Sequence, residues 1–358
     1  MKFVEKYVHG GNIYSKSPTG EWLDFSANIN PLGISGSVRQ CLTDNISGLV
    51  NYPDPSGLLP RKAIAEYYDL PLDSIVLGNG AVELLYVFFH ARKPQNVLLP
   101  VPSFSEYERA AVAGNAEIVY YQLSEAADFR LDIDRFIQKL AFIDCAIIGN
   151  PNNPTGGIIT TDGIEKIVVA AQKTGTMIIV DESFNDFLDD GIRFSARSLI
   201  GRYDNLLVLQ SLTKFYALPG LRLGFAAVPD NLTSVMEAQK DPWNMNSLAQ
   251  AAIPAALADK AYQEKSRQLI KSEQEYLVSM LSKIDTIKIF PPTVNFILLD
   301  VKKCGLTAKD LTSKLREMGI LVRNCDNYSG LTGEYIRIAV KDHEKNVKLI
   351  AAIKELLL

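Results

Sequence analysis

Residues 206–227 constrain this chain more than any other stretch of its sequence. They read LLVLQSLTKFYALPGLRLGFAA, with an apolar run of strand length at each end. Lys214 and Arg222 are the only charged side chains in the segment. Burying two cations among apolar residues is unfavourable unless an anion lies nearby. The hydroxyls of Ser211 and Thr213 add hydrogen-bond donors that suit phosphate oxygens.

Lys214 therefore has the sequence surroundings of a reactive amine. A lysine in an apolar pocket beside another cation has a lowered pKa, and its neutral amine is a nucleophile toward carbonyls. We predict that Lys214 forms a Schiff base with a phosphate-bearing aldehyde, pyridoxal 5'-phosphate. On composition alone, a surface loop with a solvated lysine and arginine is an equal alternative, because most lysines have no chemical role.

The motif S-L-T-K-F-Y-x-L-P-G-L-R-L-G resembles the lysine segment of fold-type I pyridoxal-phosphate enzymes, the aspartate aminotransferase superfamily. The resemblance implies that Lys214 carries the cofactor and that Ser211 and Arg222 bind its phosphate, with Thr213 beside them. The resemblance extends over essentially the whole chain, through several motifs in the same order.

Strands alternate with helices along the chain, which predicts a doubly wound α/β fold with candidate residues at strand ends. With the resemblance, we expect a fold-type I transferase: a large domain with a mostly parallel, seven-stranded type of sheet, and a small α+β domain. The expected parts are an N-terminal arm at 1–30 that joins the small domain, a large domain at 31–245 and the small domain at 246–358. A strand is predicted at 177–180 and an amphipathic helix at 162–174.

Composition narrows the class of protein further. A chain of 358 residues is long enough for two such domains, and its net charge of −4 leaves no basic footprint for nucleic acid. It shows no apolar run of membrane-spanning length and no apolar core of a signal peptide. The four cysteines and three histidines lack paired or metal-like spacing, so we expect free thiols, no metal site and a cytoplasmic location.

A second phosphate-binding element is expected at Gly80 and Ala81. Residues 75–85 read as strand, glycine turn and helix, an order that places backbone N–H groups and a positive helix end around an anion. The third glycine of a dinucleotide fingerprint is absent, and G-x-G alone is usually a tight turn. With Lys214 and Arg222 downstream, the resemblance implies the other half of a phosphate cup.

By resemblance, four further residues contact the cofactor. Phe104 would stack on the pyridine ring, although a core phenylalanine is the plainer alternative. Asn153, in N-N-P-T-G, would bond the phenolic oxygen. Asp181, after the strand at 177–180, would keep the pyridine nitrogen protonated and so make the ring an electron sink. Tyr52, in a Y-P-x-P context, would reach the phosphate in a neighbouring subunit, which implies a homodimer.

The resemblance also implies a substrate site for a phosphorylated amino acid. Arg323 would bind the phosphate and Arg337 would grip a carboxylate as a bidentate fork, although a solvated outer strand face is an alternative for Arg337. The expected substrate contacts are His9, Gly10, Asn28, Asn30, Asn153, Arg323 and Arg337.

Two enzyme families within the superfamily are similar to this chain: histidinol-phosphate aminotransferases and the threonine-phosphate decarboxylases of cobalamin biosynthesis. The HGGN start, the D-F-S-A-N-I-N-P-L-G segment and the lysine segment resemble the decarboxylases. Phe184 stands where many aminotransferases have a tyrosine that bonds the phenolic oxygen. The expected reaction is therefore decarboxylation of L-threonine O-3-phosphate. Aminotransfer is the alternative, and a non-catalytic regulator that binds the cofactor is a remote one.

Overall fold

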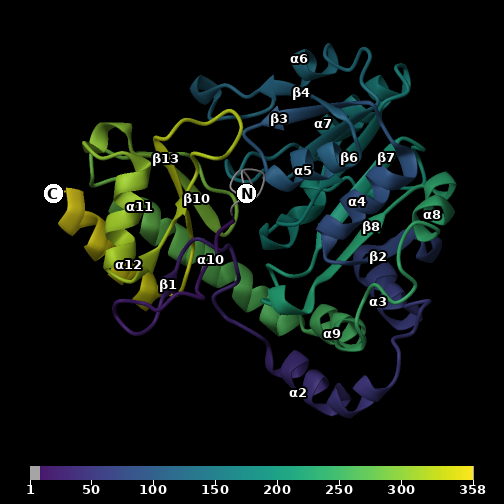
Figure 1. The fold of residues 1–358 in the computed structure, drawn as a ribbon, viewed down its shortest axis with the longest axis horizontal. Helices are drawn as coiled ribbons and strands as arrows, with labels where there is room; N and C mark the ends of the chain where they lie inside the picture. Colours follow the sequence, from purple (N-terminus) through teal and green to yellow (C-terminus); the bar gives the residue numbers. More distant parts are fainter. Residues whose placement is uncertain (1–8, 358) are drawn as a thin grey trace.

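A seven-stranded sheet organises the larger part of the chain in the computed structural model, which describes residues 9–357 (Figure 1). Only β8 runs antiparallel to its neighbours, β2 and β7, and all other pairs are parallel. The predicted mostly parallel α/β sheet is confirmed. In spatial order the strands are β2 (Ile75–Asn79), β8 (Leu223–Ala227), β7 (Leu206–Ser211), β6 (Met177–Asp181), β5 (Cys145–Gly149), β3 (Asn96–Val101) and β4 (Glu117–Gln122).

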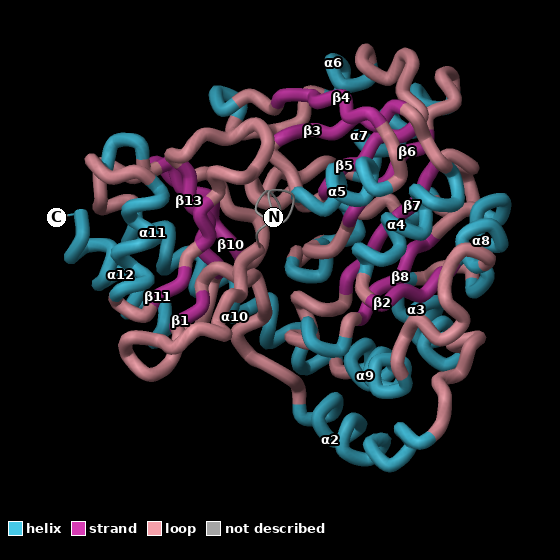
Figure 2. Tube along the Cα trace, viewed as in Figure 1, coloured by secondary structure: helices cyan, strands magenta, loops and turns pink. Residues whose placement is uncertain are grey.

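Helices cover both faces of this sheet (Figures 1 and 2). One face packs against α4 (Ala81–Arg92), α5 (Ser105–Ala113) and α8 (Asp230–Glu237). The opposite face packs against α3 (Leu58–Tyr68), α6 (Ile133–Ile137), α7 (Thr161–Gln172) and α9 (Ser247–Ala258), and α2 (Gly36–Asn45) packs against α9. Because side chains alternate along a strand, Ile179 of β6 joins the first core and Ile178 joins the second.

The smaller part of the chain is built on an antiparallel sheet. Its strands, in spatial order, are β12 (Arg323–Asn324), β13 (Tyr335–Ala339), β10 (Phe296–Asp300) and β9 (Lys288–Ile289). Its helices are α10 (Lys260–Leu281), α11 (Ala308–Glu317) and α12 (His343–Leu357). This is the expected α+β composition of the small unit, which lies beside the large sheet in Figure 1.

The N-terminal arm attaches to this smaller part. β1 (Leu23–Asp24) pairs in parallel with β11 (Ile320–Leu321), and the Ala339 N–H donates to the carbonyl of Phe25 at 2.8 Å. At the other boundary, α9 still packs against α2 and α3, and α10 follows it directly. The division at residues 30 and 245 stays a prediction.

Local signals explain where helices begin. The Thr160 hydroxyl accepts from the Gly163 N–H at the start of α7, and the Asn246 side chain accepts from the Ala249 N–H at the start of α9.

None of the helices in the described part of the chain is both long and apolar enough to span a membrane. Across residues 9–357, no group of three or more histidine, cysteine, aspartate and glutamate side chains could hold a metal ion.

Candidate active site

A cleft of about 470 Å³ lies between the two parts of the chain. The large sheet contributes residues after its strand ends, the arm contributes residues near the N-terminus, and β12 and β13 contribute one arginine each. The cleft brings together most of the residues singled out in the sequence: His9, Gly10, Asn28, Ala81, Phe104, Asn153, Ser211, Thr213, Lys214, Arg222, Arg323 and Arg337.

Asp181 lines a small cavity of about 40 Å³ that adjoins this cleft and shares Lys214, Phe104 and Asn153 with it. Gly80 immediately precedes Ala81, beside the guanidinium of Arg222.

Two other predicted site residues, Asn30 and Tyr52, line neither the cleft nor the adjoining small cavity. The Asn30 side chain is buried and donates to the Phe215 carbonyl and the Ser266 hydroxyl, each at 2.7 Å. Its geometry is that of a structural residue behind Lys214 and does not support a substrate contact. Tyr52 is 79% exposed and stacks on Trp243, with ring centroids 4.7 Å apart. Tyr52 could reach a cofactor only in another copy of the chain.

Lys214 follows the end of β7 and lies in the wall shared by the cleft and the small cavity. Burial lowers the pKa of its amine to about 8, an effect opposed by Asp181 and reinforced by Arg222. Its Nζ lies 5.6 Å from the centroid of the Phe184 ring. Phe184 offers no hydrogen-bond donor, so the contact that a tyrosine would make there is absent.

A cradle for an anion surrounds the start of α4. The helix has no side-chain cap, so its first N–H groups are open to a ligand. A Cβ added to Gly80, whose φ is 81°, would lie 2.3 Å from Nη2 of Arg222. A Cβ added to Gly224 would lie 2.3 Å from the Ala81 nitrogen. These two glycines therefore let the arginine and the helix end approach one site, beside the paired hydroxyls of Ser211 and Thr213, 2.7 Å apart.

This cradle, together with the lysine, fits pyridoxal phosphate. The helix end, the arginine and the two hydroxyls supply donors for a phosphate. Lys214 lines the same cleft, where its amine can react with an aldehyde.

Tyr107 and Ser183 fix the orientation of Asp181. The Tyr107 hydroxyl donates to Oδ2 of Asp181 at 2.7 Å, and the Ser183 N–H donates to Oδ1 at 2.9 Å. Burial and the nearby Asp181 charge raise the pKa of Tyr107 well above its usual value, so its hydroxyl keeps its proton. The sequence analysis did not identify Tyr107. Its place one helical turn after Phe104 is the signal that could have found it.

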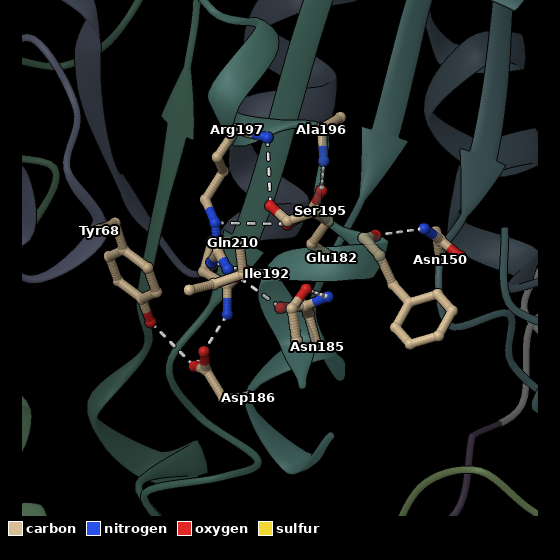
Figure 3. A network of polar contacts seen from close by, with 12 residues as sticks. Tyr68, Asn150, Glu182, Asn185, Asp186, Ile192, Ser195, Ala196, Arg197 and Gln210 are labelled. Atoms are coloured by element: carbon tan, nitrogen blue, oxygen red, sulfur yellow. Dashed lines mark hydrogen bonds and ion pairs between the residues drawn. The ribbon is translucent and has the colours of Figure 1, made fainter. Parts of the chain in front are cut away.

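Glu182, next to Asp181, belongs to a different network (Figure 3). Its carboxylate accepts from the Ser195 hydroxyl at 2.7 Å and lies 3.5 Å from Nε of Arg197. Burial raises the pKa of Glu182, and the charge of Arg197 opposes that effect. A further cleft of about 370 Å³ lies over this network, and none of its described lining residues lines the Lys214 cleft. Glu182 is therefore a structural acid.

Arg323 and Arg337 lie directly opposite each other on β12 and β13, and each is less than one-tenth exposed. Nη2 of Arg337 donates to the Ser26 carbonyl at 2.8 Å, and Nη1 donates to Oδ1 of Asn153 and, at 3.3 Å, to the Tyr328 hydroxyl. All these partners are neutral. Tyr328 and Ser26 are cleft residues that the sequence analysis did not name.

Two buried polar atoms in this region lack a hydrogen-bond partner in the described part of the chain. They are Nε of Arg337 itself and Oδ1 of Asn28, which lines the same cleft. An orphaned buried polar atom carries a free-energy penalty that a ligand can remove. A buried guanidinium whose protein partners are neutral is stabilised by an anion. This end of the cleft is therefore suited to a second anionic group.

The profile of the aminotransferase class I and II family matches residues 20–353. The chain is 34% identical to the threonine-phosphate decarboxylase of Salmonella typhimurium, over 98% of this chain and 96% of that protein. The crystal structure of the histidinol-phosphate aminotransferase from Clostridium acetobutylicum superposes with a TM-score of 0.88 at 34% identity, over 93% of this chain and 98% of that one.

The crystal structure of L-threonine-O-3-phosphate decarboxylase from Porphyromonas gingivalis superposes with a TM-score of 0.84 at 25% identity. That match covers 94% of this chain and 99% of the other. The range that the family profile matches includes the lysine segment and the two arginines, and only residues 20–30 of the arm. The chain belongs to the aminotransferase class I and II family.

Proposed function

We propose that this protein holds pyridoxal 5'-phosphate on Lys214 and decarboxylates L-threonine O-3-phosphate. The products are (R)-1-amino-2-propanol phosphate and CO2, which places the reaction in cobalamin biosynthesis. The Salmonella and Porphyromonas proteins named above carry this activity in their names. The observation that carries the proposal is the pair of buried arginines, Arg323 and Arg337, in the cleft of Lys214. Threonine phosphate presents both a phosphate and a carboxylate to such a pair.

Different residues around Lys214 would hold different parts of the cofactor. Bound there, the cofactor would accept the electron pair left at Cα when CO2 departs. Asp181 would face the pyridine nitrogen, and Tyr107 holds that carboxylate in place. Since Oδ1 of Asn153 accepts from Arg337, its amide NH2 can donate to the phenolic oxygen. The phosphate would be held by Gly80, Ala81, Ser211, Thr213 and Arg222, and Phe104 would stack on the ring.

The substrate is gripped from the opposite side of the cleft. Arg337 would take the carboxylate, and Arg323, with His9 and Gly10 of the arm, would take the phosphate. Fixing both anions orients the bond between Cα and the carboxylate, which decides which bond breaks. Lys214 would then return a proton to Cα, a role that suits an amine whose pKa is about 8.

A second candidate is aminotransfer from histidinol phosphate, which the superposition on the Clostridium structure favours. Histidinol phosphate carries a phosphate but no carboxylate. A paired assay on purified holoenzyme separates the two activities. CO2 from threonine phosphate without any keto acid supports the decarboxylase. Glutamate formed from 2-oxoglutarate and histidinol phosphate, with no CO2 from threonine phosphate, would replace it by the aminotransferase.

We further propose a cytoplasmic homodimer in which Tyr52 reaches the cofactor phosphate of the partner subunit. Exposed apolar side chains gather near Tyr52, in η1 (Ile46–Val50) and at the start of α3. Val50 is 87% exposed and Leu59 is 72% exposed, which is unfavourable in water and suits a protein interface. The division into an arm at 1–30, a large domain at 31–245 and a small domain at 246–358 belongs to the same proposal.

A further inference from the structure

Glu106 is an acid in a cleft whose charged lining residues are otherwise cations. Among the described residues that line the cleft it is the only carboxylate, and its side chain is 7% exposed. A carboxylate at this place repels an anionic substrate unless partners neutralise it. The cations in the same lining are Arg109, Lys214, Arg222, Arg323 and Arg337. The presence of Glu106 in this cleft therefore requires a structural explanation.

Two partners converge on one oxygen of Glu106. Oε1 accepts from Nε2 of His9 at 2.8 Å and from Nη1 of Arg109 at 3.3 Å. Glu106 also lies in the first turn of α5, where the helix dipole stabilises an acid. Burial raises the pKa of Glu106, but the hydrogen bond and charge of His9, with Arg109, outweigh burial and lower it. Glu106 is therefore ionised at neutral pH.

This pairing determines what His9 can donate. An ionised carboxylate only accepts hydrogen bonds, so Nε2 of His9 must carry a proton. Nδ1 can then donate to a further anion only if the imidazole is protonated. The His9 ring also contacts Phe104, with ring centroids 5.7 Å apart. Phe104 and Glu106, at the start of α5, thus hold one ring from two sides.

The rest of the arm is anchored elsewhere. The Gly11 N–H donates to the Ser26 hydroxyl at 2.7 Å, and a Cβ on Gly10 would lie 2.2 Å from the Ser26 carbonyl oxygen. Ser26 in turn accepts from Arg337 of β13 through its carbonyl. The contact between His9 and Glu106 therefore connects the arm, fixed on the small part of the chain, to α5 of the large part.

We propose that Glu106 is a positioning residue that fixes His9, in its imidazolium form, as a donor to the phosphate of the substrate and holds the arm across the cleft. This inference rests on the proposed function, because it assumes a phosphorylated amine in the cleft. Glu106 itself does not touch the phosphate. Its effect reaches the phosphate through His9 and is confined to ligands that carry one.

The test is ligand binding to the holoenzyme, followed by the absorption change of the bound cofactor. Wild type and Glu106→Gln are mixed rapidly with a series of concentrations of L-threonine O-3-phosphate or L-threonine, and the absorption change is read before any turnover. We expect Glu106→Gln to weaken binding of the phosphorylated ligand on the order of ten-fold, as loss of a supporting hydrogen bond does at other sites. Binding of L-threonine should be unchanged, as should the cofactor spectrum before ligand is added.

A double-variant cycle shows whether Glu106 acts through His9. In a His9→Gln background, Glu106→Gln should cause no further loss. The matched control is Glu125→Gln, which removes an exposed ion pair with Lys288 and should leave both affinities unchanged. Equal weakening of both ligands, a full additional loss in the His9→Gln background, or no preference of wild type for the phosphorylated ligand would overturn the inference. Because binding is measured, a failure of decarboxylation alone would overturn the proposed function and leave this inference standing.

Discussion

At the scale of single residues, the chemistry depends on how Lys214 and Asp181 are held in one buried place. Lys214 loses its charge near pH 8 because it is buried, and Arg222 adds to this effect. Asp181 keeps a fixed orientation because Tyr107 and Ser183 donate to its two oxygens. The neutral amine suits attack on an aldehyde, and the fixed carboxylate suits a pyridine nitrogen.

The lowered pKa of Lys214 predicts how stability depends on pH in the cofactor-free protein. The folded chain releases the Lys214 proton near pH 8 and the unfolded chain near pH 10.5. Between these values the unfolded state binds more protons, so stability rises with pH. Below pH 8 the buried charge destabilises the fold by about 3 kcal/mol. The advantage of Lys214→Met in free energy of unfolding, measured by urea titration, should therefore shrink from pH 7 to pH 10.5. A difference that is independent of pH would contradict this.

Tyr107→Phe tests the hydrogen bond to Asp181. The hydroxyl donates to a charged group, and losing a hydrogen bond of this kind costs about 1.5–3 kcal/mol. We expect kcat for threonine phosphate to fall roughly ten-fold or more and the absorption spectrum of the bound cofactor to shift. The control is Tyr121→Phe, which removes a long 3.4 Å contact to the Asp132 carbonyl on the surface. If both variants behave alike, Tyr107 does not position Asp181.

Residue patterns predicted much of the site and missed part of it for a physical reason. Lys214 and Arg222 stand out because cations in apolar segments need an anion, whereas Arg337 was expected only from the resemblance. Asn30 lies in the same type of motif as Asn28, yet it turns inward to Ser266. Which way a polar side chain in a loop points depends on its tertiary neighbours, which are distant in sequence. Tyr107 and Glu106 were missed for the same reason.

At the scale of elements, the phosphate cradle depends on close contact between β8 and the start of α4. Gly224 of β8 has no space for a side chain, since a Cβ would lie 2.3 Å from the Ala81 nitrogen. Gly36, the first residue of α2, has no neighbour within 4 Å of an added Cβ. The same substitution therefore has opposite consequences at the two positions.

Gly224→Ala should lower the free energy of unfolding by about 3 kcal/mol, because backbone atoms must move apart. It should also weaken cofactor binding, because the start of α4 would move away from the phosphate of the cofactor. Gly36→Ala should be neutral or stabilising by up to about 1 kcal/mol, since alanine favours the helix. Urea unfolding and cofactor titration of both variants check this. A Gly224→Ala protein that binds cofactor as tightly as wild type would show that the cradle tolerates displacement.

Elements with a strong hydrophobic pattern were the easiest to predict. The strand expected at 177–180 is β6, and the helix expected at 162–174 is α7. β4 was not predicted, because it is an edge strand that, unlike β2 at the other edge, leaves all of its side chains partly or fully exposed. An edge strand carries a weaker hydrophobic pattern than a central one.

At the scale of the whole molecule, the position of Tyr52 gives the proposed dimer a consequence for activity. Its side chain is 79% exposed and is absent from the cleft of its own chain. If it completes the site of the partner subunit, each site contains residues from two chains. The sequence motif predicts this role by resemblance, but a single chain cannot show what covers an exposed residue.

Mixing two impaired variants tests whether the active site is shared between subunits. Tyr52→Ala should lower affinity for the cofactor, and Lys214→Ala should abolish the covalent attachment that borohydride reduction traps. A mixed dimer contains one site with both Lys214 and a partner's Tyr52. Activity above that of either variant should therefore appear after the two are refolded or co-expressed together. Light scattering should give twice the mass of the chain. No recovery in proven mixed dimers would place Tyr52 outside the neighbouring site.

The most direct test of decarboxylation is a single turnover in D2O with excess holoenzyme, L-threonine O-3-phosphate and no keto acid. We expect one CO2 and one 1-amino-2-propanol phosphate per substrate, with one deuterium bound to the former Cα. Mass spectrometry of the product and of released CO2 measures both. A keto acid phosphate as product, with the amino group left on the cofactor and no CO2, would contradict the account and make the protein an aminotransferase.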